Sequence, residues 1–111
     1  MGISVSVVSS NIALWNYIDK PYFFIDKYIG EIGETFYSKP RNIKNKMIKQ
    51  FLYIYINVNT IFNSKQVEQL KKEVKILKKE RLLCKEDLKV LNNGIQMILE
   101  NKTLYLKFEY E

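Results

Sequence analysis

The side chains that could perform chemistry in this chain are few, and none of them is a histidine. Histidine exchanges protons near neutral pH more readily than any other side chain, and it is the commonest metal ligand in proteins. The single cysteine, Cys84, follows Leu82 and Leu83 and has no imidazole to act as its base. A cysteine in such surroundings usually packs and does not react. The chain also lacks a Gly-rich phosphate loop, so the sequence predicts a protein that is not an enzyme and uses no cofactor.

Carboxylates between residues 19 and 34 are the remaining candidates for chemistry. Glu31 and Glu34 would lie on one face of a helix, and carboxylate oxygens are the ligands that hard cations prefer. Helix capping and solvation account for the same residues without any ion. We therefore expect no metal site from this group, which consists of Asp19, Asp26, Glu31 and Glu34.

The basic side chains indicate a different kind of function, which is binding to a polyanion. The chain has 18 basic and 12 acidic residues, a net charge of +6, and residues 39–49 hold five basic side chains and no acidic one. Such a segment could neutralise the phosphates of a nucleic acid. However, only Arg41 and Arg81 are arginines, the residue type preferred for bidentate recognition of phosphates and bases. The candidate nucleic-acid-binding residues are Lys39, Arg41, Lys44, Lys46 and Lys49.

The basic charge can also arise without any nucleic acid, in two ways. Residues 64–89 are likewise rich in lysine, and there Glu68, Glu73 and Glu80 partly balance the charge, as on an ordinary solvated surface. In addition, lysine, isoleucine, asparagine and tyrosine are abundant, whereas alanine occurs once and proline twice. The abundant residues have A/T-rich codons, so a low-GC genome would account for part of the basicity. The net charge alone does not establish a function.

Aromatic residues make up 14% of the chain, which is rich for a soluble protein. Some must belong to the core, but Tyr105 falls on the polar side of an alternating segment, where core packing does not explain it. Exposed tyrosine and tryptophan are typical anchors of protein interfaces, because they are large and rigid and carry a polar tip. Incidental exposure is the alternative. The candidate partner-binding residues are Tyr105, Lys107, Tyr53, Tyr55 and Trp15.

Both ends of the chain predict β-strands. Near the N-terminus, Ile3, Val5 and Val7 alternate with serines, and residues 104–110 alternate apolar and polar side chains more strictly. With only two or three strands in the chain, we expect these terminal strands to be sheet edges. An unpaired edge is either an aggregation hazard or a place where a partner adds a strand.

The segments between the terminal strands predict helices. Asp19-Lys20-Pro21 and Ser38-Lys39-Pro40 each place a capping side chain before a proline that suits the first helical turn. After the first triplet, apolar residues recur every three or four positions over residues 22–36, which predicts a helix. After the second, a helix to about residue 50 followed by a third strand near residues 51–59 competes with one long helix, and composition slightly favours the strand.

The C-terminal half predicts a helical hairpin. We expect Ser64 to cap a helix in which Val67, Leu70 and Leu77 share an apolar seam. A break near residues 83–85 precedes a last helix that ends before Asn101. The sequence therefore predicts one α+β domain over residues 1–111, in which a small sheet with N- and C-terminal strands packs against three to four helices.

These observations together favour surface recognition over catalysis. No segment reaches the ~20 apolar residues that cross a membrane, and a single cysteine favours a reducing, cytoplasmic location. In size and composition the chain resembles small proteins of A/T-rich bacteria and their mobile elements that block another protein, such as immunity proteins of toxin systems and phage-encoded inhibitors. The sequence thus predicts a non-enzymatic inhibitor or immunity protein with a protein partner. A small nucleic-acid-binding protein and a homo-oligomer that pairs through strand edges are the alternatives.

Overall fold

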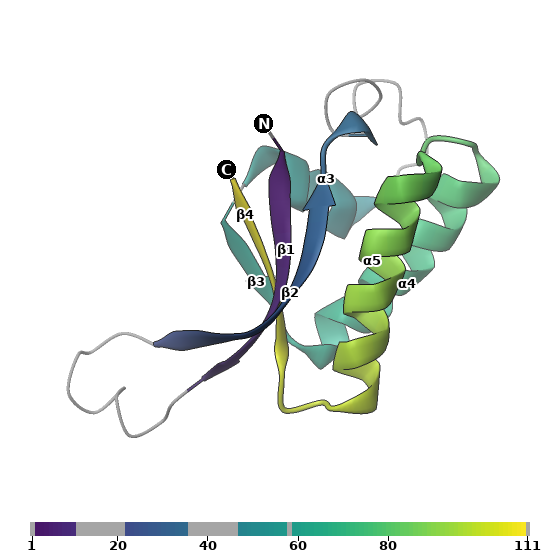
Figure 1. Ribbon diagram of the computed structural model, residues 1–111. Helices are drawn as coiled ribbons and strands as arrows, with labels where there is room; N and C mark the ends of the chain where they lie inside the picture. Colours follow the sequence, from purple (N-terminus) through teal and green to yellow (C-terminus); the bar gives the residue numbers. More distant parts are fainter. Residues whose placement is uncertain (1, 11–21, 36–46, 58, 111) are drawn as a thin grey trace.

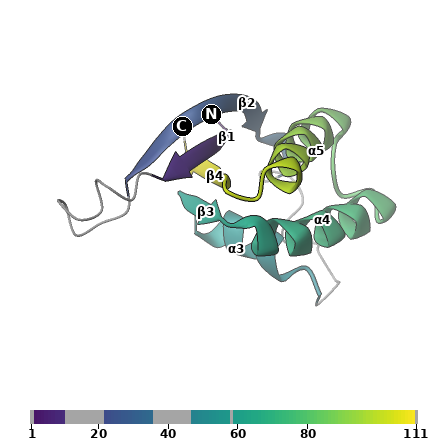
Figure 2. The same ribbon diagram turned by 90° about the horizontal axis from the view of Figure 1, so that it is seen from below.

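The computed structural model describes residues 2–10, 22–35, 47–57 and 59–110, and it has the predicted α+β architecture (Figure 1). The described strands form one antiparallel sheet in the order β2-β1-β4-β3, and the described helices pack on one side of it (Figure 2). Its elements are β1 (Ile3–Ser10), β2 (Phe23–Ile32), α3 (Lys49–Ile56), β3 (Thr60–Phe62), α4 (Ser64–Lys79), α5 (Lys85–Glu100) and β4 (Tyr105–Tyr110).

The terminal strands are the two central strands of the sheet, so the prediction that they form its edges is wrong. β1 pairs with β2 on one side and with β4 on the other, and β4 also pairs with β3. The ends of the chain consequently lie side by side (Figure 1). Strand order depends on long-range pairing, and the outer positions belong to β2 and β3, whose local sequence patterns do not predict strands at these residues.

Residues 23–32 form the strand β2, so the helix predicted over residues 22–36 is wrong where the structure describes it. Two register shifts against β1 leave Asp26 and Ile29 without directly opposed residues. Each such bulge displaces the side-chain alternation by one position, which produces the three-residue spacing of Ile25 and Tyr28 that imitates a helix. Gly30 has a φ of +155°, a conformation that other residues rarely adopt and that no helix contains.

Residues 49–56 form the helix α3, so the slight preference for a strand near residues 51–59 is wrong. The third strand exists, but it is β3, which has only three residues. Burial favours the helix over the strand, because Phe51 and Ile54 lie three positions apart and both enter the core. Between α3 and β3, Asn59 adopts a φ of 72°, which asparagine tolerates better than most residues.

The predicted helical hairpin consists of α4 and α5, which pack against each other. The cap of α4 is Asn63 and not Ser64, which is the first helical residue. The Asn63 side chain accepts from the Gln66 backbone N–H (3.0 Å), and the Gln66 side chain accepts from the Asn63 backbone N–H (2.9 Å). This reciprocal capping box fixes the start of α4. The break predicted near residues 83–85 is confirmed, since α5 begins at Lys85.

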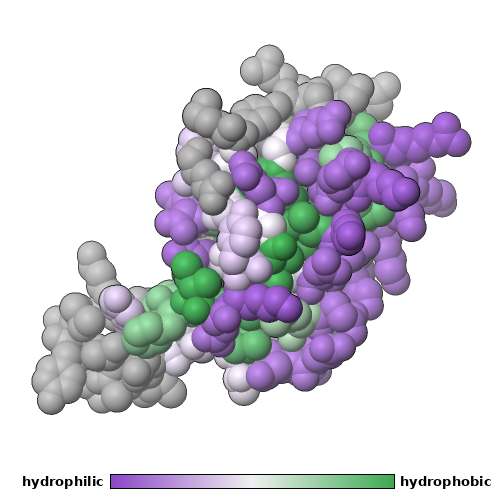
Figure 3. Space-filling view, in the orientation of Figure 1, coloured by the Kyte–Doolittle hydropathy of each residue, from purple (hydrophilic) through white to green (hydrophobic). Residues whose placement is uncertain are grey.

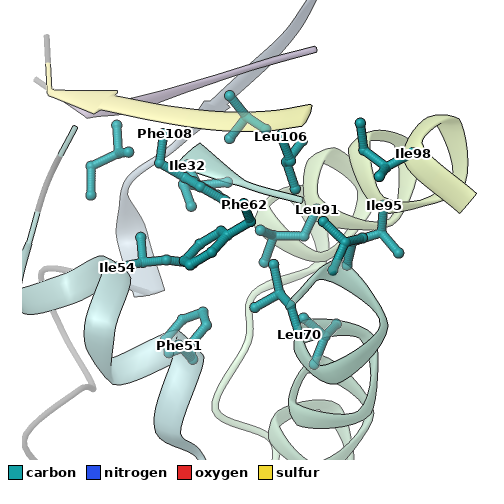
Figure 4. Packing of buried hydrophobic residues seen from close by; sticks show 14 of the residues in the cluster. Ile32, Phe51, Ile54, Phe62, Leu70, Leu91, Ile95, Ile98, Leu106 and Phe108 are labelled. Atoms are coloured by element: carbon teal, nitrogen blue, oxygen red, sulfur yellow. The ribbon is translucent and has the colours of Figure 1, made fainter. Parts of the chain in front are cut away.

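The hydrophobic core lies between the sheet and the helices (Figure 4). Val5, Val7, Leu106 and Phe108 contribute from the central strands, and each is fully buried. Complete burial of such a side chain stabilises the fold by roughly 1.5–3 kcal/mol. Because neighbouring strand residues point to opposite faces, the residues that alternate with these on β1 and β4 lie on the other face of the sheet, here called the open face.

Candidate functional site along the outer strand

The outer strand β2 carries the largest group of exposed hydrophobic side chains in the described part of the chain. Ile25 is 61% exposed and Tyr28 is 54% exposed, and Tyr22 and Phe24 are exposed on the same segment. Figure 3 shows hydrophobic surface gathered along this strand and in the seam beside the helices, with hydrophilic side chains around it. Clustered exposed hydrophobic residues of this kind mark interaction sites more often than scattered ones.

Cross-strand pairing brings residues of β2 and β4 together on the open face. Ser6 of β1 lies opposite Tyr28 on one side and Lys107 on the other. Val8 likewise lies opposite Ile25 and Tyr105. Directly opposed residues of an antiparallel sheet share a face, so each small β1 residue lies between larger side chains of its neighbours. The open face therefore unites exposed residues of β2 with two predicted partner-binding residues.

An aromatic contact packs one end of the open face. The rings of Phe23 and Tyr105 meet edge to face with centroids 5.4 Å apart. Val8 is fully buried but lies outside the main core cluster, as expected for a residue on the open face beneath such side chains. Edge-to-face pairs contribute about 0.5–1.5 kcal/mol beyond the area that they bury. Tyr105 is thus half-buried, and packing within the sheet accounts for part of its position.

Lys107 is also engaged within its own strand. Its Nζ lies 3.3 Å from Oε2 of Glu109, two residues further on and on the same face. Exposed ion pairs of this kind contribute about 1 kcal/mol or less to stability. Lys107 and Glu109 therefore place opposite charges on the open face without creating a strong local field.

The edge of β2 is protected against uncontrolled strand pairing. The two bulges interrupt its regular pattern, and the Ser9 hydroxyl donates to Oδ1 of Asp26 at the second of them (2.9 Å). Bulges and charged residues are common devices against edge-to-edge aggregation. Recognition on this strand would consequently depend on its side chains more than on a continuous row of backbone groups.

A shallow hollow of about 290 Å³ separates β2 from α5. Lys27, Tyr28 and Ile29 line it from the strand, and Asn93, Gln96 and Met97 line it from the helix. Lys27 supplies the only formal charge among these lining residues. On the side of β2 that faces the helices, the exposed surface therefore continues into a hollow lined by both polar and apolar side chains.

The remaining predicted partner-binding residues do not join this surface. Tyr53 is exposed on α3, where its ring lies 6.3 Å from the core residue Phe62, so it is on the helical side of the sheet. Tyr55 is half-buried against the core. Trp15 lies outside the described residues.

The basic segment that is predicted to bind nucleic acid is described only at its end. Lys49 is the first residue of α3 and is exposed. The other four candidates, Lys39, Arg41, Lys44 and Lys46, lie outside the described residues. Their role stays a prediction.

The hydrophobic residues of β2 are absent from the site predicted by the sequence. Tyr22, Phe23, Phe24 and Ile25 form an unbroken run of large apolar side chains. One face of an amphipathic helix cannot accommodate four consecutive apolar residues, so this run is a usable signal against a helix. It is compatible with a strand that has contacts on both faces.

Two buried carboxylates serve the architecture. Oε1 of Glu73 accepts from the Phe51 backbone N–H (2.8 Å), and the Asp87 carboxylate accepts from the backbone N–H groups of Gly33 (3.3 Å) and Thr35 (2.8 Å). Burial raises the pKa of the Glu73 carboxyl, while hydrogen bonds from Phe51, Gln69 and Gln50 act in the opposite direction. These carboxylates satisfy buried backbone donors, a structural role that needs no substrate.

The one group of potential metal ligands in the described residues is Glu34, Cys84 and Glu86, whose ligand atoms lie within 4.8 Å of one another. The Cys84 sulfur instead accepts from the Asp87 backbone N–H (3.4 Å) and caps α5. Burial raises the pKa of the Cys84 thiol, and the Asp87 carboxylate adds to that effect. A thiol that resists ionisation is a poor metal ligand and a poor nucleophile.

Among the described helices, none has the length and apolar character needed to cross a bilayer. With respect to known proteins, neither a family model nor a curated protein nor a solved structure matches this chain.

Proposed function

We propose that this protein is a non-enzymatic binding module that recognises another protein through β2 and the adjoining open face. The observation that carries the proposal is the pair of exposed hydrophobic residues Ile25 and Tyr28, which β2 places on the open face. Tyr22 and Phe24 are exposed nearby, but Phe24 lies opposite Ser9 and therefore on the other face of the sheet. Large apolar and aromatic side chains in one patch are the usual centre of a protein interface. A stoichiometric inhibitor or an immunity protein, which covers the active surface of a toxin or another effector, would use such a patch.

The charges around the proposed surface are of both signs. The net charge of the chain is +6, but β2 itself carries Asp26 and Glu31 beside Lys27, so the basic excess lies elsewhere in the sequence. Complementary charge mainly accelerates encounter and selects the partner, whereas the buried apolar residues supply most of the affinity. The partner is therefore a protein with an apolar centre and a rim of mixed charge on its binding surface.

Site-directed photo-cross-linking tests this proposal in the cells that produce the protein. A photoreactive residue at position 25 or 28 should cross-link to one discrete protein, while the same residue at Lys72, which is exposed on α4, should not. The purified partner should then bind the unmodified chain in a fixed ratio. Replacement of Ile25 by aspartate should abolish that binding because it places a charge at the apolar centre.

Three different outcomes would each contradict the proposal in a recognisable way. Cross-linking of position 25 to position 25 of a second copy, together with dimers in light scattering, would identify a homo-oligomer. Cross-linking to nucleic acid, with affinity that falls steeply as salt is raised, would identify a nucleic-acid-binding protein. Equal cross-linking from positions 25 and 72 would show that the exposed residues of β2 are not a specific site.

A further inference from the structure

A second hollow, of about 470 Å³, lies at the opposite edge of the sheet from β2. Lys49, Gln50 and Tyr53 line it from α3, residues 59–62 line it from β3 and the preceding turn, and Gln66 lines it from the first turn of α4. Its volume is within the range of small-molecule sites, which is roughly 300–1,000 Å³. It is separate from the surface proposed above to bind a protein.

Two buried polar atoms in the lining have no hydrogen-bond partner in the described part of the structure. They are Oγ1 of Thr60 and Oε1 of Gln50. Thr60 is only 8% exposed, and its position in β3 alternates with Ile61 so that its side chain faces the helical side, as that of Phe62 does. An unsatisfied buried hydroxyl or amide costs about 1–3 kcal/mol. Such groups are uncommon in a folded protein unless something else completes their hydrogen bonds.

The other residues that line the hollow indicate what kind of ligand could hydrogen-bond to Thr60 and Gln50. Tyr53 offers an aromatic ring that is half-exposed, and the exposed Lys49 supplies one positive charge. Gln66, which also lines the hollow, uses its side-chain oxygen to cap α4 and carries an amide nitrogen that can act as a donor. None of the described residues that line this hollow is acidic. The set therefore combines a stacking surface, hydrogen-bonding groups and one cation.

The walls of the hollow are held by contacts that need no ligand. Glu73 of α4 accepts from the Phe51 backbone N–H and so fixes the start of α3 beside Lys49 and Gln50. Asn59 accepts with its side-chain oxygen from the Tyr110 backbone N–H (3.0 Å), which attaches the turn before β3 to β4. A preformed site loses less entropy on binding than one that must be ordered by its ligand.

We infer that this hollow is a binding site for a small flat ligand with a polar edge and one anionic group, the chemistry of a nucleoside monophosphate. The ring would stack on Tyr53, and the phosphate would lie against Lys49. The Thr60 and Gln50 oxygens are covered in this structure, so their side chains would rotate toward the hollow to hydrogen-bond to the polar edge of the ring. Stacking on an exposed aromatic residue contributes about 1–3 kcal/mol per base in other proteins. Lysine binds phosphate as a point charge, which is sufficient for a single anionic group.

Titration of the isotopically labelled protein with AMP, GMP, CMP and UMP tests the inference. Binding of at least one of them at millimolar concentration should move the backbone amide signals of Tyr53, Thr60 and Gln66 and leave those of β2 unchanged. Thr60→Val, which keeps the shape of the side chain, should weaken binding about fivefold or more because one hydrogen bond is lost. Tyr53→Leu should weaken it about tenfold or more.

Controls distinguish the parts of the proposed contact. Lys49→Met should weaken binding of the nucleotide but not of the corresponding nucleoside, whereas Lys89→Met on the exposed side of α5 should change neither. Thr60→Val should leave the empty protein as stable as before or more stable, because the unsatisfied hydroxyl is removed. The inference is overturned if none of the four nucleotides moves these signals. Binding that Thr60→Val and Tyr53→Leu leave unchanged would also overturn it.

Discussion

The two outer strands of the sheet, β2 and β3, differ in how each avoids pairing with a strand of another molecule. β2 has ten residues and β3 has three, and each has a neighbouring strand on one side only among the described residues. β2 remains long and carries exposed hydrophobic side chains, with bulges that make its edge irregular. β3 is too short to recruit a strand, and the Tyr53 ring of α3 lies near its residue Phe62 on the helical side of the sheet. The comparison teaches that length and side-chain content, more than the position at an edge, distinguish the proposed recognition surface on β2 from the short outer strand β3.

A buried carboxylate also anchors the chain near each outer strand, and it comes from a different helix in each case. On the side of β3, Glu73 is fully buried and fixes the start of α3 from α4. On the side of β2, Asp87 of α5 binds the backbone just after the strand, at Gly33 and Thr35. A carboxylate from the helical hairpin thus holds the chain on each side of residues 36–46. Both anchors lie beneath the surface and do not involve the exposed residues Ile25 and Tyr28 of β2.

The largest expected effect on stability comes from the anchor beside β3. Glu73→Ala leaves the Phe51 backbone N–H without its acceptor and creates a cavity, which should lower the free energy of unfolding by about 2–4 kcal/mol. Urea unfolding followed by circular dichroism measures it. Glu68→Ala, on the exposed side of the same helix, is the matched control and should change stability by no more than about 0.5 kcal/mol. Equal effects of the two substitutions would show that Glu73 does not anchor α3.

The next largest effect on stability is expected where β2 lies close to α5. A Cβ atom at Gly30 would lie 2.9 Å from Cγ2 of Val90, and the positive φ adds strain for any other residue. Gly30→Ala should therefore destabilise the protein by about 1–3 kcal/mol. Adding Val90→Ala should recover the steric part but not the conformational part. Thermal unfolding of the two variants measures both effects. A Gly30→Ala variant as stable as the original chain would contradict this account.

The pH dependence of stability offers a smaller test of the same anchor. Burial raises the pKa of the Glu73 carboxyl above its ordinary value of 4.5, so the folded state favours the protonated form. Its contribution to stability is then complete below the unfolded-state pKa and is lost as the pH rises through the folded-state pKa. Glu73→Gln cannot ionise, so its stability relative to the original chain should increase as the pH rises from about 4.5. Parallel stability curves for the two proteins from pH 4 to 8 would contradict the prediction.

The smallest expected effect on stability is at the proposed recognition surface. Ile25→Ser should change the free energy of unfolding by no more than about 0.5 kcal/mol, because the side chain is already mostly exposed. The exposed residue Ile56 at the end of α3 provides the matched control, Ile56→Ser. A large loss of stability in Ile25→Ser alone would mean that this residue is structural and not available for recognition.

Much of the fold could be predicted from local patterns. The strands near the two ends follow alternation, more strictly in β4 than in β1, and α4 and α5 follow helical spacing with a break that Cys84 marks by capping. β2 could not be recognised from spacing because its two bulges displace the alternation. The strand order could not be read from the sequence at all, since it depends on pairing between residues as distant as Ile3 and Tyr110.

The candidate site was predictable only in part for the same reason. Alternation alone was enough to place Tyr105 and Lys107 on the polar face of β4, where the structure has them. Their neighbours Ile25 and Tyr28 could be found only once β2 was known to pair with β1. Tyr53 was grouped with Tyr105 by residue type, although the two lie on different sides of the sheet.

Recognition through β2 is tested most directly by the affinity of the cross-linked partner for two double variants. Ile25→Ser/Tyr28→Ser alters the exposed residues of β2 on the open face, and Tyr53→Ser/Ile56→Ser alters those of α3. We expect calorimetric titration to show that the first pair weakens binding on the order of a hundredfold or more, as loss of two interface anchors does, while the second pair leaves the affinity unchanged. Unchanged affinity for the β2 variant, or a comparable loss for the α3 variant, would contradict the account.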